Sequence, residues 1–290
     1  MIKDRFSFAP AYRARTIFNI VNALFFTGLT ILMVLPLWKV LVDSFNNQTT
    51  YGITLFPQKP SVAAYKMIFT QSSLLRPFLV SIYTTLIGTA VGLFLCTTGA
   101  FVLKEKDLPG RKLFSFFLLF TMIFEGGIVP SFLVMKDLRL LNTYWAVILP
   151  AAMNVYNLIL MRNFFENIPE SLYESAALDG CTPIMTFLRI VLPLSSAALA
   201  SIGLFYGVAL WSNYTSFAIY ISDATKHNFQ MRLRTLILDE NALAAASSLG
   251  VSSKSVQNAA IVVAILPFAF LYPFLQKYFV TGVNMGAVKE

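Results

Sequence analysis

Six long runs of apolar residues dominate this chain, and most of its charged residues lie between those runs. The runs occupy residues 17–42, 78–103, 113–135, 143–161, 192–217 and 259–280. A helix needs about 20 mainly apolar residues to cross a bilayer, and each run is close to that length or longer. The pattern therefore predicts an all-α membrane protein with six transmembrane helices.

Composition points to the same class. Of the 290 residues, 57% are hydrophobic and only 12% are charged, and the mean hydropathy is +0.69. A soluble domain carries about 25% charged residues, so the apolar surplus exceeds what one globular core could use. The net charge of +8 would suit a nucleic-acid binder, but the basic residues form short clusters beside apolar runs, as in membrane proteins. We expect no nucleic-acid partner and a single membrane domain over residues 1–290.

Basic clusters predict the side of the membrane on which each end of the chain lies. Four basic residues precede the first run, and Lys104, Lys106, Arg111 and Lys112 bracket the connection between the second and third runs. The positive-inside rule places both clusters in the cytoplasm. Six spans then leave both termini cytoplasmic, including the tail at residues 281–290. The first run is too long for a signal sequence and lacks a small-x-small cleavage site, so we expect it to be retained.

Three connections are then predicted to lie outside, at residues 43–77, 136–142 and 218–258. They also hold basic residues, but long loops obey the positive-inside rule poorly. Within the last connection, residues 228–239 place apolar side chains among Arg232 and Arg234. That mixture predicts an amphipathic helix at the membrane interface.

No constellation of catalytic or metal-binding residues is visible. Cys96 lies in an apolar run and Cys181 in a polar loop, so no disulfide is expected, and His227 is the single histidine. No phosphate-binding loop of the form Gly-x-x-x-x-Gly-Lys-Ser/Thr occurs. We therefore expect no catalytic residue, no metal, no cofactor bound by this chain and no enzyme activity.

The polar segment at residues 174–193, between the fourth and fifth runs, is the most informative part of the chain. Pro169 suits a first helical turn, and Gly180 suits the left-handed conformation that ends a helix. Thr182 and Pro183 suit the start of another helix. The segment therefore predicts two short helices joined by a glycine break.

This segment resembles the EAA loop in the membrane subunits of ABC importers. That loop reads Glu-Ala-Ala, three residues, Gly, nine residues, then Ile-x-Leu-Pro. The matching residues are Glu174, Ala176, Gly180, Ile190, Leu192 and Pro193. Ser175 replaces the first alanine, and a Gly-x-x-x-Gly-Ala-Val-Lys motif ends at Lys289. On these motifs the chain is similar to the smaller, second permease of maltose-type carbohydrate importers, closest to permeases for complex polysaccharides and oligosaccharides.

The resemblance implies a fold, a function and partners. The fold is a type I ABC importer transmembrane domain with a cytoplasmic coupling loop at residues 166–193. The function is half of the pore of a binding-protein-dependent oligosaccharide importer in the bacterial inner membrane, completed by a second permease as a heterodimer. Two ATPase subunits would bind ATP and Mg, and an extracytoplasmic sugar-binding protein would deliver the substrate.

The resemblance also implies the residues that contact the ATPase. They are Glu174, Ser175, Ala176, Ala177, Leu178, Asp179, Gly180 and Cys181 in the loop, with Gly286, Ala287, Val288 and Lys289 in the tail. Tyr173, Ala176 and Ala177 are expected to form a face that a partner groove could grip.

Polar and aromatic residues within or beside the runs are candidates for a substrate path. They are Glu125, Asn154, Tyr156, Asn157, Trp211, Asn213 and Tyr214. Aromatic rings stack on sugars and amides bond hydroxyl groups, but the same residues can belt the membrane interface or bond helices together. Gly126, Gly127 and Pro130 predict a break in the third helix beside Glu125. Glu125 then either faces the path at a gate or lies at a helix end, in water or paired with an arginine.

Other functions stay open at this point. An importer for amino acids, peptides or phosphate would share the loop, although the tail is of the sugar type. An ion-coupled secondary transporter would need buried carboxylates or inverted repeats and would leave the loop unexplained. An intramembrane enzyme would need a nucleophile or metal constellation. Loss of transport without a partner ATPase would separate an importer from the last two.

Overall fold

The computed structural model describes residues 9–47, 52, 54–238 and 251–287, with side chains described from residue 15 to residue 273 within these ranges. All regular secondary structure in this part of the chain is helical, and Asn46 and Pro60 form an isolated antiparallel bridge. The predicted all-α class is therefore confirmed. The chain divides into two compact units: residues 1–68 with 241–262, and residues 69–240 with 263–290.

The first unit contains α1 (Ala9–Ser44), most of α2 (Ala63–Thr70) and the beginning of α15 (Ser253–Ala287). A hydrogen bond of 2.6 Å joins the hydroxyl groups of Ser44 at the end of α1 and Tyr65 in α2. The Ser255 hydroxyl donates to the carbonyl oxygen of Asn46 and so ties α15 to the same place. Most large apolar side chains of α1 are exposed, as expected of a helix that meets lipid or another subunit.

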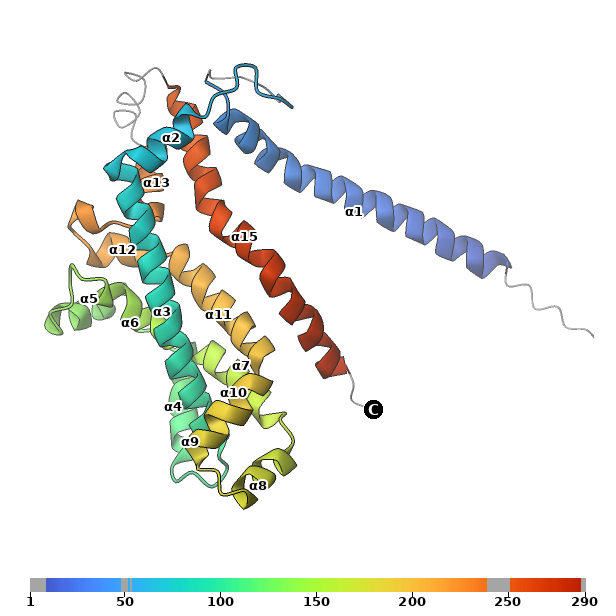
Figure 1. Cartoon of the computed structure of the whole chain (residues 1–290), viewed down its shortest axis with the longest axis vertical. Coiled ribbons are helices and arrows are strands. Elements are labelled where there is room, and N and C mark those ends of the chain that lie inside the picture. Colours follow the sequence, from blue (N-terminus) through green and yellow to red (C-terminus); the bar gives the residue numbers. More distant parts are fainter. Residues whose placement is uncertain (1–8, 48–51, 53, 239–250, 288–290) are drawn as a thin grey trace, which may run out of the picture. The chain divides into compact units, whose positions relative to one another are not determined.

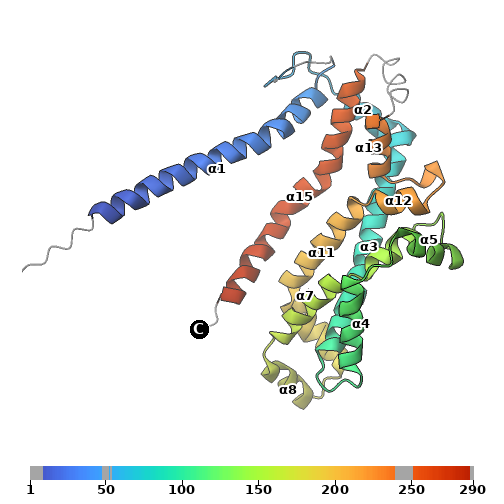
Figure 2. The ribbon, with the colours of Figure 1, turned by 180° about the vertical axis from the view of Figure 1, so that it is seen from behind.

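The second unit is organised around α3 (Ser72–Lys104). Both α7 (Val155–Glu166) and α11 (Ser196–Trp211) pack along it, as Figures 1 and 2 show. A Cβ atom on Gly92 would lie 2.8 Å from the Tyr206 ring, so this close approach of α11 requires glycine. Buried side chains of the three helices form one core. They include Cys96, Ala100, Leu158, Met161, Phe165, Ile202 and Tyr206.

Short elements cover the two ends of α3. Near its N-terminal end lie α6 (Trp145–Ala152), α12 (Thr215–Tyr220), η2 (Ala224–Lys226) and α13 (Phe229–Leu238). Near its C-terminal end lie α4 (Arg111–Ile123), α8 (Glu170–Leu178) and α9 (Pro183–Thr186) (Figure 1). The predicted helix at residues 228–239 is thus present as α13, and residue 239 lies outside the described residues.

Within the described residues, three helices are long and apolar enough to cross a membrane alone: α1, α3 and α15. Three further apolar segments are bent pairs: α4 with α5 (Ile128–Asp137), α6 with α7, and Pro183–Leu194 with α11. These pairs bend by 118°, 44° and 81°. Six helical segments therefore occupy the places of the six predicted spans, if each bent pair counts as one. The fifth ends before residue 217, the predicted end, because α11 stops at Trp211.

The predicted break in the third apolar run is confirmed. Helix α4 ends at Ile123, and α5 begins after Gly127, whose φ of +88° suits glycine alone. Glu125 lies in the break and is exposed. The glycine pair therefore lets the chain change direction by 118° without a strained side chain.

Candidate functional site

The coupling loop turns sharply after α8. Gly180 has a φ of +77°, and the Cys181 N–H donates to the Ala176 carbonyl oxygen at 2.9 Å. This is the left-handed helix end that glycine favours. Thr182 then caps α9, because its hydroxyl oxygen accepts from the Met185 N–H at 3.3 Å. The predicted helix, glycine break and second helix are all present.

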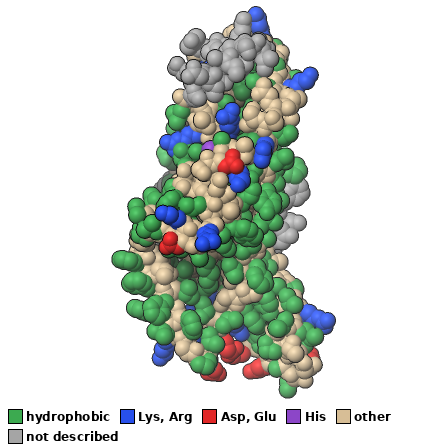
Figure 3. All heavy atoms as spheres, turned by 90° about the vertical axis from the view of Figure 1, so that its left-hand side faces the viewer, with side chains coloured by type: hydrophobic (Ala, Val, Ile, Leu, Met, Phe, Trp, Pro, Cys, Tyr) green, Lys and Arg blue, Asp and Glu red, His purple; other side chains and the backbone are tan. Residues whose placement is uncertain are grey.

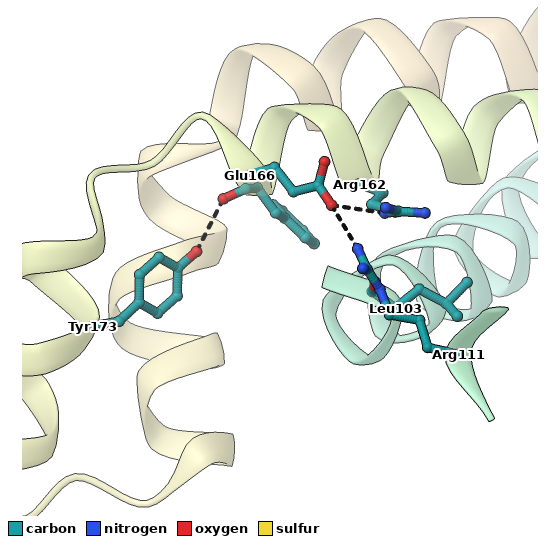
Figure 4. Close-up of polar contacts among 6 residues, drawn as sticks. Leu103, Arg111, Arg162, Glu166 and Tyr173 are labelled. Carbon is teal, nitrogen blue, oxygen red and sulfur yellow. Dashed lines mark hydrogen bonds and ion pairs between the residues drawn. The ribbon is translucent and has the colours of Figure 1, made fainter. Parts of the chain in front are cut away.

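Tyr173 fastens α8 to the body of the second unit. Its hydroxyl donates to the Phe165 carbonyl oxygen at 3.2 Å (Figure 4), and Lys104 Nζ lies 3.1 Å from its ring centroid. Burial raises the pKa of Tyr173 to about 12, so the hydroxyl remains a donor at neutral pH. Ala176 is 3% exposed. These two side chains face the chain itself, which corrects the expectation that they form a face open to a partner.

A charged cluster joins the end of α7 to the connection between α3 and α4. Glu166 Oε1 lies 3.1 Å from Arg111 Nη2 and 2.9 Å from Arg162 Nε. Arg111 Nε also donates to the Leu103 carbonyl oxygen at 2.9 Å (Figure 4). Partly exposed ion pairs stabilise little one by one, but here Glu166 and Arg111 together link α7 and α4 to the end of α3. Spacing along the chain gave no sign of this pairing, because Arg111 and Glu166 are 55 residues apart.

The surface of α8 that faces away from the unit is apolar and acidic. Leu178 is 89% exposed, and Ile184, beyond the turn, is 71% exposed. Glu174, Ala177 and Asp179 are also exposed. Large apolar side chains open to solvent and rimmed by charge are typical of a protein–protein contact. Of the predicted coupling residues, all except buried Ala176 and half-buried Cys181 are open.

Beyond α9 the coupling loop runs into the core. Its next five residues, Phe187–Val191, form a π-helix, a feature often found at functional sites. The Phe187 ring centroid lies 4.9 Å from that of Phe101 and 6.4 Å from that of Phe165. Packed side chains thus connect α9 to α3 and α7.

Trp211 does not belong to an open substrate path. It is 4% exposed, and its indole N–H donates to the Ala264 carbonyl oxygen at 3.0 Å. Its ring also makes edge contacts with Phe78 and Phe268, at centroid distances of 5.8 and 6.1 Å. Neither stacking on a sugar nor a place in an interfacial belt agrees with that burial, so both expectations for Trp211 are corrected.

The predicted asparagines bond to the backbone. Asn154 Oδ1 accepts from the Asn157 N–H at 3.0 Å and caps α7. Asn157 is 4% exposed. Asn213 Oδ1 accepts from the Ser216 N–H at 3.0 Å at the start of α12. Both side-chain contacts are local caps at the start of a helix, so they are not the helix-to-helix hydrogen bonds of the alternative expectation.

The remaining predicted residues are not brought together. Glu125 and Tyr156 are exposed on different elements, whereas Tyr214 lines a cavity with α13. The backbone of Gly286 and Ala287 ends α15, and Val288 and Lys289 lie outside the described residues.

Known proteins share both the sequence and the fold of this chain. The polygalacturonan/rhamnogalacturonan transport system permease protein YtcP of Bacillus subtilis is 42% identical, over 89% of this chain and 93% of that protein. Protein LplC of the same organism is 39% identical, over 96% of each chain. A chain of a bacterial ABC transporter involved in import of the acidic polysaccharide alginate is 30% identical. Its structure superposes with a TM-score of 0.87, over 92% of this chain and 98% of that one.

A second solved chain shows a likeness of fold alone. It comes from the alginate transporter in complex with its alginate pentasaccharide-bound periplasmic protein, and has 14% identity and a TM-score of 0.59. The type I ABC importer fold and a permease function without enzyme activity follow from the close matches. The sequence model of one protein family, described as the binding-protein-dependent transport system inner membrane component, matches residues 109–285, more than half of the sequence. The chain therefore belongs to the family of inner membrane components of binding-protein-dependent transport systems.

Proposed function

We propose that this permease imports oligosaccharides and is driven by an ATPase that docks on α8 and the turn after it. The observation that supports docking is Leu178, 89% exposed on a helix that Tyr173 fastens to the core. Covering such a side chain with a partner stabilises the complex by the hydrophobic effect. Glu174 and Asp179 beside it would suit a basic rim on the ATPase.

The names of the relatives support sugar as the substrate class. YtcP is named for polygalacturonan and rhamnogalacturonan, and the alginate importer handles an acidic polysaccharide. On the family pattern, a second permease completes the pore and two ATPase subunits bind ATP and Mg. An extracytoplasmic binding protein delivers the oligosaccharide. Both termini and the coupling loop lie in the cytoplasm, where residues 286–289 reach the ATPase.

Contacts around α8 suggest how motion reaches the pore. ATP-driven closure of the ATPases would move α8 and α9 together. Tyr173 would carry that motion to the end of α7, and Phe187 would carry it to α3. Rigid-body rocking of the packed helices would then alternate access between the two sides of the membrane.

A co-purification experiment tests the docking surface. The permease is co-expressed with its partner permease and ATPase, and the ATPase recovered with it is quantified. Leu178→Asp should reduce recovery by about tenfold or more, because a charge replaces the apolar contact. Leu138→Asp makes the same change at a residue 59% exposed after α5, and should leave recovery unchanged.

The substrate class is tested with the same complex in lipid. ATP hydrolysis should rise when a binding protein loaded with an oligosaccharide is added.

The outcomes of these two experiments separate the two parts of the proposal. Full ATPase recovery with Leu178→Asp would contradict the docking role of α8. A chain that assembles with no ATPase at all would instead contradict the importer function.

A further inference from the structure

The outward side predicted for this chain is richer in positive charge than the usual orientation rule favours. The three outer connections hold nine Lys and Arg residues against five Asp and Glu residues. Long loops obey the positive-inside rule poorly, so membrane orientation does not account for these cations, and they are available for a role in binding. On the face shown in Figure 3, Lys and Arg side chains predominate over acidic ones in the middle part.

A shallow, open cavity of about 370 Å³ includes one of these basic residues, Arg234, in its lining. Five of the lining residues belong to α13, and the sixth, Tyr214, follows the end of α11. The six residues are Tyr214, Gln230, Leu233, Arg234, Ile237 and Leu238. The volume falls within the roughly 300–1,000 Å³ usual for small-ligand sites. The second unit therefore offers a site large enough for part of an oligosaccharide.

Arg234 supplies the positive charge in the lining of this cavity. The guanidinium carbon lies 4.4 Å from the centroid of the Tyr214 ring. A guanidinium stacked on an aromatic face keeps its N–H edges directed outward in its own plane. Those edges match the two oxygens of a carboxylate, which arginine binds through two parallel hydrogen bonds.

The other walls suit the rest of a sugar ring. Gln230 supplies an amide that can both donate to and accept from hydroxyl groups. Leu233 and Ile237 supply apolar surface against which the C–H face of a pyranose can rest. One cation, one amide and an apolar wall are therefore gathered in one cavity.

We infer that this cavity binds a uronate residue of an acidic oligosaccharide, with the carboxylate on Arg234 and the ring against Leu233 and Ile237. The inference rests on the proposed import function and names its substrate class. The excess of basic over acidic residues in the outer connections would also attract an anionic substrate.

The test uses the assembled transporter in phosphatidylcholine nanodiscs, without binding protein. Isothermal titration measures the affinity for trigalacturonate and for its methyl ester, which lacks the charges. Arg234→Gln should weaken trigalacturonate binding by about tenfold or more and leave the ester unaffected, because a charge-assisted hydrogen bond is lost. Arg234→Lys, which keeps the charge, should retain part of the affinity.

Lys136→Gln serves as the matched control, since it removes one exposed basic charge outside the cavity. Its affinity for trigalacturonate should equal that of the unchanged transporter. Basal ATP hydrolysis and melting temperature should be the same for all three variants, which shows that they fold and assemble.

Three results would overturn the inference while leaving the import function intact. Trigalacturonate could bind Arg234→Gln as well as the unchanged protein, or only neutral oligosaccharides could stimulate ATP hydrolysis. Alternatively, Arg234→Gln could matter only in membranes that contain phosphatidylglycerol, which would make the cavity a lipid headgroup site. Absence of stimulation by every loaded binding protein would instead contradict the import function itself.

Discussion

Tyr173 is held on two sides, by a hydrogen bond from its hydroxyl to Phe165 and by the Lys104 ammonium above its ring. These contacts join α8 to α7 and to the end of α3. A hydrogen bond of this kind stabilises by about 0.5–1.5 kcal/mol, and a cation over a ring by about 0.5–2 kcal/mol. They are too weak to decide whether the fold forms, and we expect their role to be in making α8 and α7 move together.

Tyr173→Phe and Lys104→Met should therefore weaken coupling more than assembly. We expect both variants to recover ATPase normally and to hydrolyse more ATP for each oligosaccharide transported into proteoliposomes. The measurement is the ratio of the two rates. Tyr272→Phe removes a hydroxyl from a residue 59% exposed on α15 and should leave the ratio unchanged. An unaltered ratio in the first two variants would show that these contacts do not transmit motion.

Glycine residues determine where two helices of this chain end and how closely two others pack. Gly127 and Gly180 supply the positive φ values that end one helix and redirect the chain, in the α4–α5 break and after α8. Gly92 acts differently, because it lies inside α3 and gives Tyr206 room to pack against the backbone. The 33-residue helix α3 is therefore the central helix of its unit, against which α6, α7, α11 and α13 pack.

Gly92→Val should destabilise the second unit. The added Cβ would lie 2.8 Å from the Tyr206 ring, so α11 must shift or the ring must leave its place. Overpacking of this kind costs about 1–3 kcal/mol. The melting temperature of the purified complex should fall by several degrees.

Gly28→Val provides the comparison, because it makes the same change inside α1, where no atom beyond the adjacent turns of the helix lies within 4 Å of the added Cβ. It should have a much smaller effect on the melting temperature. Equal losses in the two variants would mean that helix propensity, not the contact with Tyr206, explains the glycine at position 92.

The chain exposes many large apolar side chains, as expected of a membrane subunit in a larger assembly. Within the described residues, α4 has no buried side chain and α1 presents apolar side chains along most of its length. Lipid or a second permease would cover those helices. On the proposed function, the acidic and apolar end of α8 would instead be covered by a soluble ATPase, so the two kinds of surface would differ in chemistry.

The two natural cysteines provide a test of that assembly. Cys181, half-buried at the turn after α8, should react with a water-soluble maleimide in the permease alone and be protected once the ATPase binds. Cys96 is fully buried and should stay unreactive in both states. Mass spectrometry of the labelled chain reads both sites in one sample. Equal labelling of Cys181 with and without ATPase would place the docking surface elsewhere.

Local sequence determined much of this protein. The length of the apolar runs predicts six helical segments, because a helix that crosses a bilayer must be long and apolar. Gly180 with Thr182, and Gly126 with Gly127, predict two helix ends, because backbone conformation depends on residues close in sequence. The spacing from Glu174 to Pro193 was sufficient to indicate the family.

Tertiary structure alone decided which side chains meet. Trp211 looks like a ligand residue in sequence, yet Ala264 and Phe268 of α15 enclose it. Glu166 pairs with Arg111, 55 residues away. Arg234 reaches Tyr214 only because α13 packs near the end of α11. Helix periodicity says that a residue lies on a helix, but its neighbour across the core depends on how the helices are packed, so these contacts could not be predicted from local sequence.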